Sequence, residues 1–143
     1  MATASEQKYD FTVPSLLAAA GTTRRRLTNM KAGKHCDHVV ELQLVVAALN
    51  QLPNGTYARI EDWERNLVTF FNQDRNLQQL TSKKNTQKGV AVRRHINQER
   101  LDETQRDTIR NVRQRWNEIK NELEDFEDFK RKINDILFRR LRR

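Results

Sequence analysis

Cysteine, proline and glycine are scarce in this sequence, and each shortage narrows the classes of protein it can belong to. The 143 residues include one Cys, two Pro and four Gly. Because Cys36 is the single cysteine, the chain cannot form an internal disulfide or a zinc site built from several cysteines. Because few prolines and glycines force few turns, the composition favours long helices.

Long apolar runs are also missing. No stretch reaches the roughly eighteen apolar residues that cross a bilayer, and the opening MATASEQKYD lacks the apolar core of a secretory signal. We therefore expect no membrane-spanning segment and an intracellular protein of the cytoplasm or the nucleus. The length suits one domain with a modest core.

Positive charge is what the chain has in excess. Its 27 Lys and Arg outnumber its 19 Asp and Glu, which gives a formal net charge of +8. A basic chain of this size favours a polyanionic partner, nucleic acid before an anionic membrane surface. The predicted partner is nucleic acid, DNA rather than RNA, and no membrane.

The hydrophobic pattern predicts mostly helices, interrupted by short strands. Residues 35–40 (HCDHVV) and 76–80 (NLQQL) are short and tolerate extended structure, whereas the other apolar segments are longer and have helical spacing. Aromatic residues such as Trp63 and Phe70 fall on the apolar face of such a helix, so we expect them in a core rather than stacked on bases. Helices are expected at 14–20, from Glu41 to Leu52, over 60–72, and from a Ser82 cap to about residue 96.

Residues 104–143 carry a different pattern, because apolar side chains recur there at alternating three- and four-residue steps. This heptad-like seam is typical of long helices that pack on another helix. We expect a helical hairpin packed on the rest of the domain, with an oligomer through these helices as the alternative. Asp125 would cap the second helix, unless one long helix runs through. The domain plan is a flexible start (1–12), a core (13–103) and this C-terminal helical extension (104–143). The seam comprises Ile109, Val112, Trp116, Ile119, Leu123 and Phe126.

The candidates for chemistry lie in three short segments, HCDHVVELQ, RNLQQL and SKKNTQKG. Asp37 and His38 are adjacent at the end of the first expected strand. Asn76 opens the second strand, and Asn85 lies between lysines near the start of a helix. Each residue alone is ordinary, and it is their order on a strand–strand–helix plan that singles them out.

This succession resembles the HNH nucleases, also called ββα-metal or His-Me finger nucleases, over residues 35–89. The resemblance implies that His38 is the general base, that Asp37 and Asn85 hold a divalent metal, and that Asn76 fixes the loop after the histidine. The implied metal is Mg²⁺, with Mn²⁺ as a substitute. The implied fold class is α+β and mostly α-helical, in which a small two-stranded ββα-metal motif with a helical insertion precedes long C-terminal helices.

The chemistry of phosphodiester hydrolysis agrees with these residue types. The reaction needs an activated water and stabilisation of negative charge on the phosphate. A histidine titrates near neutral pH and suits the first task, and a hard cation with oxygen ligands such as Asp37 and Asn85 suits the second. The expected function is a metal-dependent endonuclease with low sequence specificity, acting on DNA.

The sequence departs from the family pattern in two places. Family members often join the two strands by a short loop, whereas here residues 41–75 intervene with expected helices. The glycines and the proline that often follow the histidine are replaced by VVELQLVV. A surface insertion costs little free energy, so the strands are still expected to pair.

Other charged residues have two readings each. Lys83, Lys84, Lys88 and Arg93 bind substrate phosphates if the protein is a nuclease, and otherwise form a solvated helix face. Glu41 is either a further metal ligand or a hydrogen-bond partner of the ligands, or it pairs with a lysine instead. His35 shares strand parity with Asp37 and is either a further ligand or a surface histidine.

Two rival functions share some of these features. A non-catalytic, basic nucleic-acid-binding module has the same charge but no turnover. A helical interaction protein uses the C-terminal heptads and needs no nucleic acid. A toxin would add an inhibitor or immunity protein as partner, and the sequence does not separate a toxin from an effector, a mobile element or a phage protein.

Overall fold

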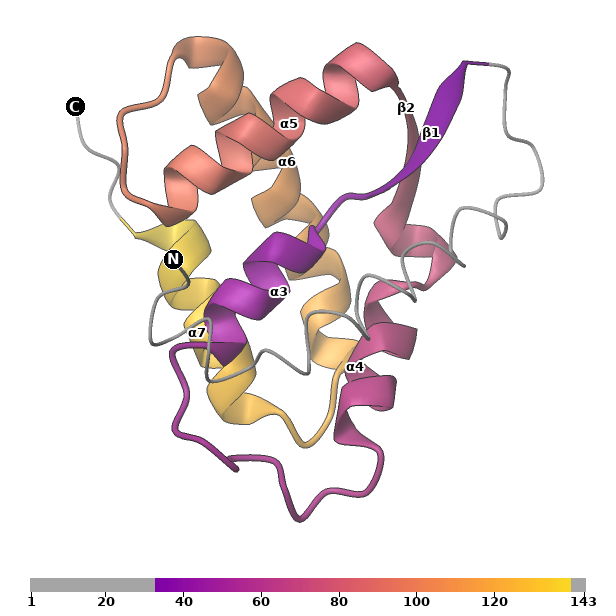
Figure 1. Ribbon diagram of the computed structural model, residues 1–143, viewed down its shortest axis with the longest axis vertical. Helices are drawn as coiled ribbons and strands as arrows, with labels where there is room; N and C mark the ends of the chain where they lie inside the picture. Colours follow the sequence, from indigo (N-terminus) through magenta and orange to yellow (C-terminus); the bar gives the residue numbers. More distant parts are fainter. Residues whose placement is uncertain (1–32, 140–143) are drawn as a thin grey trace.

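The computed structural model describes residues 33–139, which fold into five α-helices and a two-stranded sheet (Figure 1). The α+β, mostly helical fold class predicted from the sequence is confirmed. The helix expected at 14–20 and the expected flexible start lie outside the described residues. The elements are β1 (Lys34–His38), α3 (Leu42–Leu49), α4 (Trp63–Phe71), β2 (Leu77–Thr81), α5 (Ser82–Ile96), α6 (Glu103–Ile119) and α7 (Glu127–Phe138), with 3-10 turns at Asp74–Asn76 and Lys120–Glu122.

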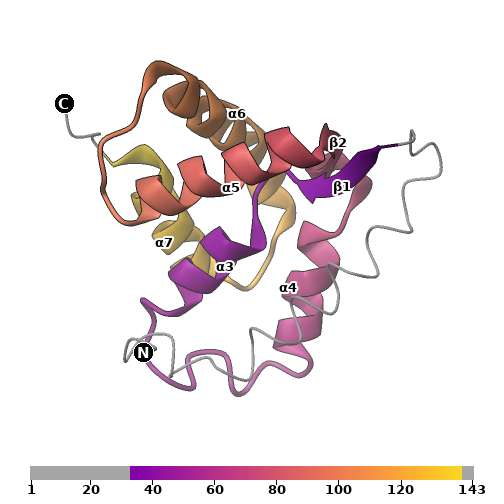
Figure 2. The same cartoon turned by 45° about the horizontal axis from the view of Figure 1, so that its top comes forward.

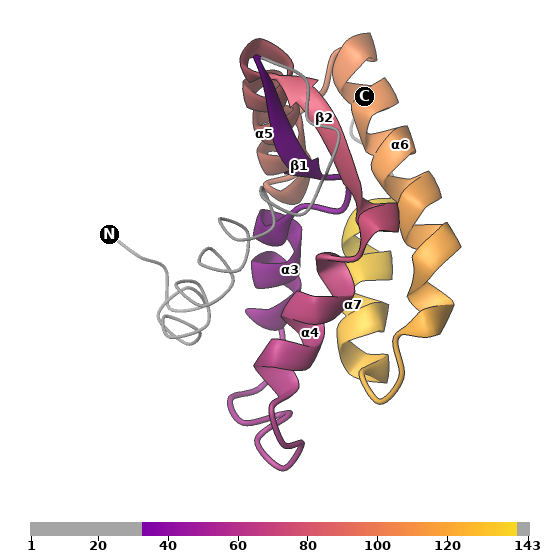
Figure 3. The same cartoon turned by 90° about the vertical axis from the view of Figure 1, so that its right-hand side faces the viewer.

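The sheet pairs strands that are far apart in the sequence. β1 and β2 are antiparallel, with Lys34 opposite Thr81 and His38 opposite Leu77. Helices α3 and α4 lie between the strands in the chain, and α5 follows β2 without a loop. The hairpin and α5 form one end of the molecule, and α3, α4 and α7 form the other (Figure 3). The insertion therefore lengthens the connection without preventing the pairing.

Helix α5 starts where its sequence supplies a cap. The Thr81 hydroxyl accepts a hydrogen bond from the Lys84 amide at 3.2 Å, so Thr81 is the N-cap rather than Ser82 as expected. The Asp102 carboxylate and the Gln105 side chain cap α6 reciprocally. Helix α5 contacts α6 and also α3, and the view in Figure 2 shows it between them.

A single apolar cluster joins the C-terminal helices to the rest of the described chain. Phe71 of α4 stacks on Trp116 of α6 at 6.2 Å between ring centroids, and it meets Phe129 of α7 edge-on at 5.9 Å. The Trp116 indole also donates to the Asn134 side chain at 2.7 Å, which ties α6 to α7. The heptad-like residues are thus buried inside the described chain, as the packed hairpin predicts. Those buried residues are Ile109, Val112, Trp116, Ile119, Leu123 and Phe126.

The bend between α6 and α7 differs from the expectation. Asp125 adopts a left-handed conformation, with φ of 67°, and does not cap α7. Helix α7 begins at Glu127, and its N-cap position is Phe126, which makes no side-chain cap hydrogen bond. The prediction of an Asp125 cap was wrong because the bend needed a residue that tolerates positive φ, and Asp does so more easily than most. None of the helices within 33–139 has the length and apolarity to cross a membrane.

Candidate active site

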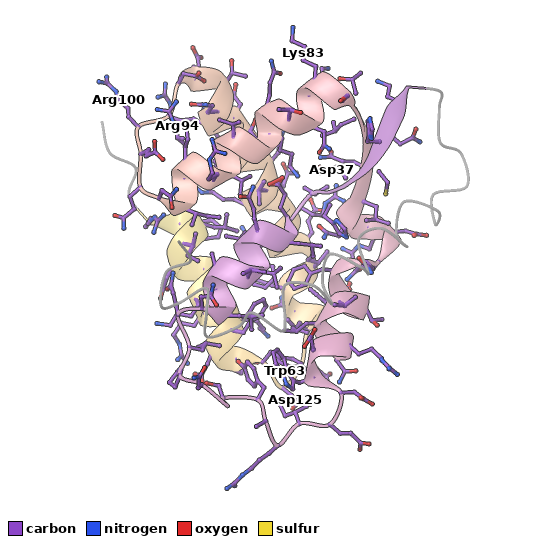
Figure 4. The ribbon with its side chains drawn as sticks, in the orientation of Figure 1. Asp37, Trp63, Lys83, Arg94, Arg100 and Asp125 are labelled. Carbon is purple, nitrogen blue, oxygen red and sulfur yellow. The ribbon has the colours of Figure 1, made fainter. Side chains whose placement is uncertain are left out.

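Asp37 and His38 are the last residues of β1, and their side chains find partners on different elements. Alternation along a strand sends adjacent side chains to opposite faces of the sheet. The Asp37 carboxylate contacts α5 through Lys88, whereas the His38 ring contacts Asn72 at the end of α4. The site therefore lies where the hairpin, α4 and α5 meet, and Figure 4 shows Asp37 at this junction.

The Asp37 carboxylate is buried and already pairs with a cation. Its Oδ2 accepts hydrogen bonds from the Lys88 ammonium at 2.7 Å and from the Gln78 amide at 2.9 Å. Lys88 is 7% exposed, and its ammonium also donates to the His38 carbonyl. Because buried charges are costly unless they are paired, the Lys88 side chain is fixed against the end of β1. It is not a freely exposed lysine like its neighbours Lys83 and Lys84.

Glu41 adds a second carboxylate to this group. Its Oε1 lies 4.0 Å from the Lys88 Nζ, and its Oε2 accepts a hydrogen bond from Gln43 at 2.9 Å. Burial raises the pKa of Glu41, and the Lys88 charge and the Gln43 hydrogen bond oppose that rise. Gln43 also donates to the Gly89 carbonyl at 3.0 Å, which links α3 to α5. Two carboxylates thus face one ammonium.

The His38 ring is nearly buried and is held by a single side chain. It is 8% exposed, and its Nε2 lies 2.7 Å from the Asn72 Oδ1. Burial lowers the pKa of His38, while the hydrogen bond to Asn72 and the charge of Asp37 work in the opposite direction. A lowered pKa keeps the imidazole neutral near neutral pH, so it is able to accept a proton.

Asn76 joins the chain after His38 to the start of β2. Its side chain is fully buried; Oδ1 accepts from the Val40 amide at 2.9 Å, and Nδ2 donates to the carbonyls of Val40 at 3.2 Å and Phe71 at 2.9 Å. Its own carbonyl accepts from the Val39 amide at 2.7 Å. These hydrogen bonds hold the segment after His38 against the start of β2; the loop-fixing role that the family resemblance implies for Asn76 would use such contacts.

The remaining candidates lie along α5 and β1. Asn85 is half-buried on the first turn of α5, three residues before Lys88 and therefore on a neighbouring position of the same face. Among residues 33–139, the α5 side chain that contacts Asp37 is Lys88 and not Asn85. Lys83, Lys84 and Arg93 are exposed, and His35 is half-buried on β1.

The donor chemistry at this site fits a divalent cation. Mg²⁺ prefers oxygen ligands and uses one or two protein carboxylates while it keeps several waters. Asp37 and Glu41 supply carboxylate oxygens, and the Lys88 ammonium already pairs with both of them. Asn85 lies one turn before Lys88 on α5 and could add an amide oxygen. The described residues contain no group of three or more His, Cys, Asp or Glu placed to hold a metal ion together, so a metal at Asp37 would rely on water for most of its ligands.

A cleft of about 780 Å³ lies between α5 and α6 and reaches the same residues. Gln78 and Lys88, both of which contact Asp37, form part of its wall. Lys84 of α5 and Arg115 of α6 add positive charge, Asp102 and Glu118 add negative charge, and much of the remaining wall consists of amide and hydroxyl side chains. The cleft is therefore a polar approach to the Asp37 side of the hairpin.

Sequence reasoning missed three partners of the candidate residues. Gln78 faces Asp37 across the sheet, and its role follows from the register, which the sequence alone does not give. Lys88 was predicted to bind a substrate phosphate. Its position three residues after Asn85 on the same helix could have indicated that it lies near the other candidate residues. Asn72 carries no motif, and only its place just after a helix distinguishes it.

Comparisons with known protein families, with curated proteins and with solved structures find no match for this chain.

Proposed function

We propose that this protein is a metal-dependent endonuclease of the HNH kind, which hydrolyses phosphodiester bonds of DNA with low sequence specificity. The observation that carries the proposal is the strand–strand–helix unit formed by β1, β2 and α5. This unit joins Asp37 and His38 to the helix that bears Asn85, and Asn76 ties its strands together. The pairing of the two strands across the inserted helices is an observation independent of the order of these residues in the sequence.

His38 acts as the general base in this proposal. Its lowered pKa leaves the ring neutral near neutral pH, which lets it take a proton from the attacking water. Asn76 keeps the backbone after His38 in one conformation, because its side chain makes two hydrogen bonds to Val40 and a third that anchors it to Phe71. A base held in one position accelerates the reaction more than a mobile base, because no conformational entropy is lost in orienting it at each turnover.

Asp37 and Asn85 are the residues that would hold Mg²⁺ or Mn²⁺, with Glu41 close by. When bound, such an ion supplies Lewis-acid stabilisation of the negative charge that grows on the phosphate and the leaving oxygen. The buried ammonium of Lys88 supports this assignment, since the carboxylates around it already favour positive charge. Loss of the 3′ oxygen as leaving group gives products with 5′-phosphate ends.

The substrate is held by its phosphates. Lys83 and Lys84 are exposed on the first turn of α5, where the backbone amides of a helix N-terminus also attract anions. Lys83, Arg94 and Arg100 lie along the same end of the molecule as Asp37 (Figure 4). Phosphate contacts carry no base information, so cutting should depend on salt far more than on sequence. Arg93 is exposed farther along α5 and extends this charge.

Incubation of the full chain with supercoiled plasmid and with RNA, each with magnesium or with a chelator, tests the proposal. The parent should nick plasmid only with magnesium, and His38→Ala should lower the rate by about 10²- to 10⁴-fold, the usual contribution of a general base. Arg131→Ala is the matched control, because Arg131 is an exposed residue of α7. Circular dichroism should show all three proteins folded. Equal rates for His38→Ala and the parent would show that His38 is not the base.

The nicking assay, together with measurements of DNA binding and of oligomeric state, separates the rival functions. A non-catalytic module binds plasmid in a salt-sensitive way but never nicks it, with or without magnesium. A helical interaction protein forms concentration-dependent oligomers and binds neither nucleic acid. An intracellular location and an inhibitor or immunity partner for a toxin remain sequence-based proposals.

A further inference from the structure

We infer that Asn72 is a positioning residue for His38: its amide oxygen holds the imidazole with the proton on Nε2, so that Nδ1 carries the lone pair that receives a proton. The inference deepens the proposed nuclease function and rests on it. It adds a residue that lies outside the strand–strand–helix motif and that no sequence pattern indicated.

The contact is buried on both sides. The Nε2 of His38 and the Oδ1 of Asn72 are 2.7 Å apart, and the two residues are 8% and 7% exposed. Little water competes for either atom at that exposure, so the hydrogen bond sets the ring orientation more strongly than a surface contact does. It also joins residues 34 positions apart, from the end of β1 to the end of α4.

Asn72 is itself on a rigid support. It is the C-cap residue of α4, and its backbone amide donates to the Val68 carbonyl at 3.0 Å. The preceding residue, Phe71, is fully buried and packs on Trp116 and Phe129. The end of α4 is therefore anchored in the main core, and the amide of Asn72 is presented to His38 from a fixed position.

The chemistry of the contact selects one tautomer. An amide oxygen has lone pairs and no proton, so the ring nitrogen that faces it must bear the hydrogen. A neutral imidazole carries one N–H, and with that hydrogen on Nε2 the lone pair is left on Nδ1. The other ring nitrogen of a working histidine commonly sets its role in this way. The opposite tautomer follows if the amide of Asn72 presents its NH₂ group, and the experiment distinguishes the two.

Nitrogen-15 NMR of the full chain labelled at histidine reads the tautomer directly, at a pH where the ring is neutral. The sequence has three histidines, and loss of a signal in His38→Gln assigns the one that matters. In the parent, Nε2 of His38 should give the shift of a protonated ring nitrogen and Nδ1 that of an unprotonated one. The reverse pattern would overturn the inference without any variant of Asn72.

Two variants then connect the tautomer to turnover. Asn72→Leu removes the acceptor, so His38 should become a mixture of tautomers and kcat should fall by about 10- to 100-fold, as is usual when a partner that orients a catalytic group is lost, while KM for plasmid stays the same. Asn72→Asp keeps an acceptor oxygen and should retain the parent tautomer and most of kcat. Asn66→Leu, at an exposed position of α4, is the matched control.

The outcomes are separable from the fate of the proposed function. If the parent cuts plasmid and Asn72→Leu keeps both the parent tautomer and the parent kcat, the positioning role fails and the nuclease proposal stands. If the parent does not cut under any condition, the nuclease proposal fails and the catalytic role of Asn72 falls with it. If Asn72→Leu does not fold, the parent spectrum still decides the tautomer, and an Asn72→Asp protein that loses the parent tautomer but keeps the parent kcat would overturn the positioning role.

Discussion

At the scale of single residues, the buried cation of Lys88 explains why two carboxylates can lie together under the hairpin. Asp37 and Glu41 are nearly buried and would repel each other, and the Lys88 ammonium, which pairs with both, offsets that repulsion. The ammonium also donates to the His38 carbonyl, so it fixes the backbone that carries both candidate residues. The charge at this position is therefore part of the stability of the site as well as of its chemistry.

Replacing that charge should have a large effect, because removal of one partner of a buried pair leaves the other uncompensated. We expect Lys88→Met to lower the free energy of unfolding by about 3–5 kcal/mol, measured by urea denaturation. Added Mn²⁺ should raise the melting temperature of Lys88→Met more than that of the parent, since the carboxylates regain a cation. Lys132→Met, on α7, is the control and should unfold like the parent. A Lys88→Met protein as stable as the parent would show that the pair contributes nothing.

Residues that belong to a short sequence motif could be predicted, whereas a residue that matters only through a tertiary contact could not. Asp37, His38, Asn76 and Asn85 stand in short segments whose order is readable along the chain. Asn72 could not be predicted from the sequence, because its importance comes from a hydrogen bond between two buried side chains on different elements. Such a contact depends on how α4 is packed, and a packing arrangement leaves no spacing rule in the sequence.

At the scale of elements, the N-terminal turn of α5 combines several sources of positive potential. Thr81 caps the helix, no acidic residue occupies the first turn, and Lys83 and Lys84 are exposed there. The partial positive charge of a helix N-terminus adds to that of the lysines. This turn follows β2 directly, so it lies beside the hairpin that carries Asp37 and His38.

Removing these lysines should change the salt dependence of DNA binding. Each phosphate contact contributes about 0.9 to the slope of log affinity against log salt concentration. We expect Lys83→Ala and Lys84→Ala each to reduce the slope by about that amount and to weaken binding equally on unrelated sequences, measured by fluorescence anisotropy with a chelator present. Arg131→Ala is the control for loss of one exposed charge. An unchanged slope in both lysine variants would place the DNA on another surface.

The element boundaries were predictable because they depend on local spacing. The second strand was expected at 76–80 and is Leu77–Thr81, and the helix expected from Glu41 begins at Leu42. The expected caps were less accurate: Thr81 rather than Ser82 caps α5, and Asp125 adopts a positive φ in the bend before α7 instead of capping it. Pairing of β1 with β2 across the inserted helices was expected from the family resemblance, since local patterns do not say which strands meet.

At the scale of the whole molecule, the C-terminal ends of α5 and α7 are held together by side chains that contact backbone carbonyls. The His95 Nε2 donates to the Ile136 carbonyl at 2.7 Å. Arg139 donates to the carbonyls of His95 and Ile96, and Arg113 donates to that of Leu137. The helix that carries Asn85 is thus tied at its far end to the extension, so the two parts should unfold as one unit.

His95 should make this shared stability depend on pH. Burial is the main reason that its pKa lies below the ordinary 6.5, and the charges of Arg139 and Arg113 lower it further, against the effect of the Ile136 carbonyl. The folded protein therefore resists a proton that the unfolded chain accepts. Stability should be complete above about pH 6.5 and should fall as the pH drops below that value, by up to about 1.4 kcal/mol per unit of pH for one such histidine.

Urea denaturation of the parent between pH 8 and pH 5 measures this loss, and His95→Gln identifies its source. A glutamine amide still donates to the Ile136 carbonyl but cannot take up a proton, so the variant should lose less stability on acidification than the parent. Part of the fall should remain, because the pKa of His38 is also lowered by burial and contributes with the same sign. If the parent and His95→Gln lose the same free energy of unfolding on acidification, His95 is not a source of the pH dependence of stability.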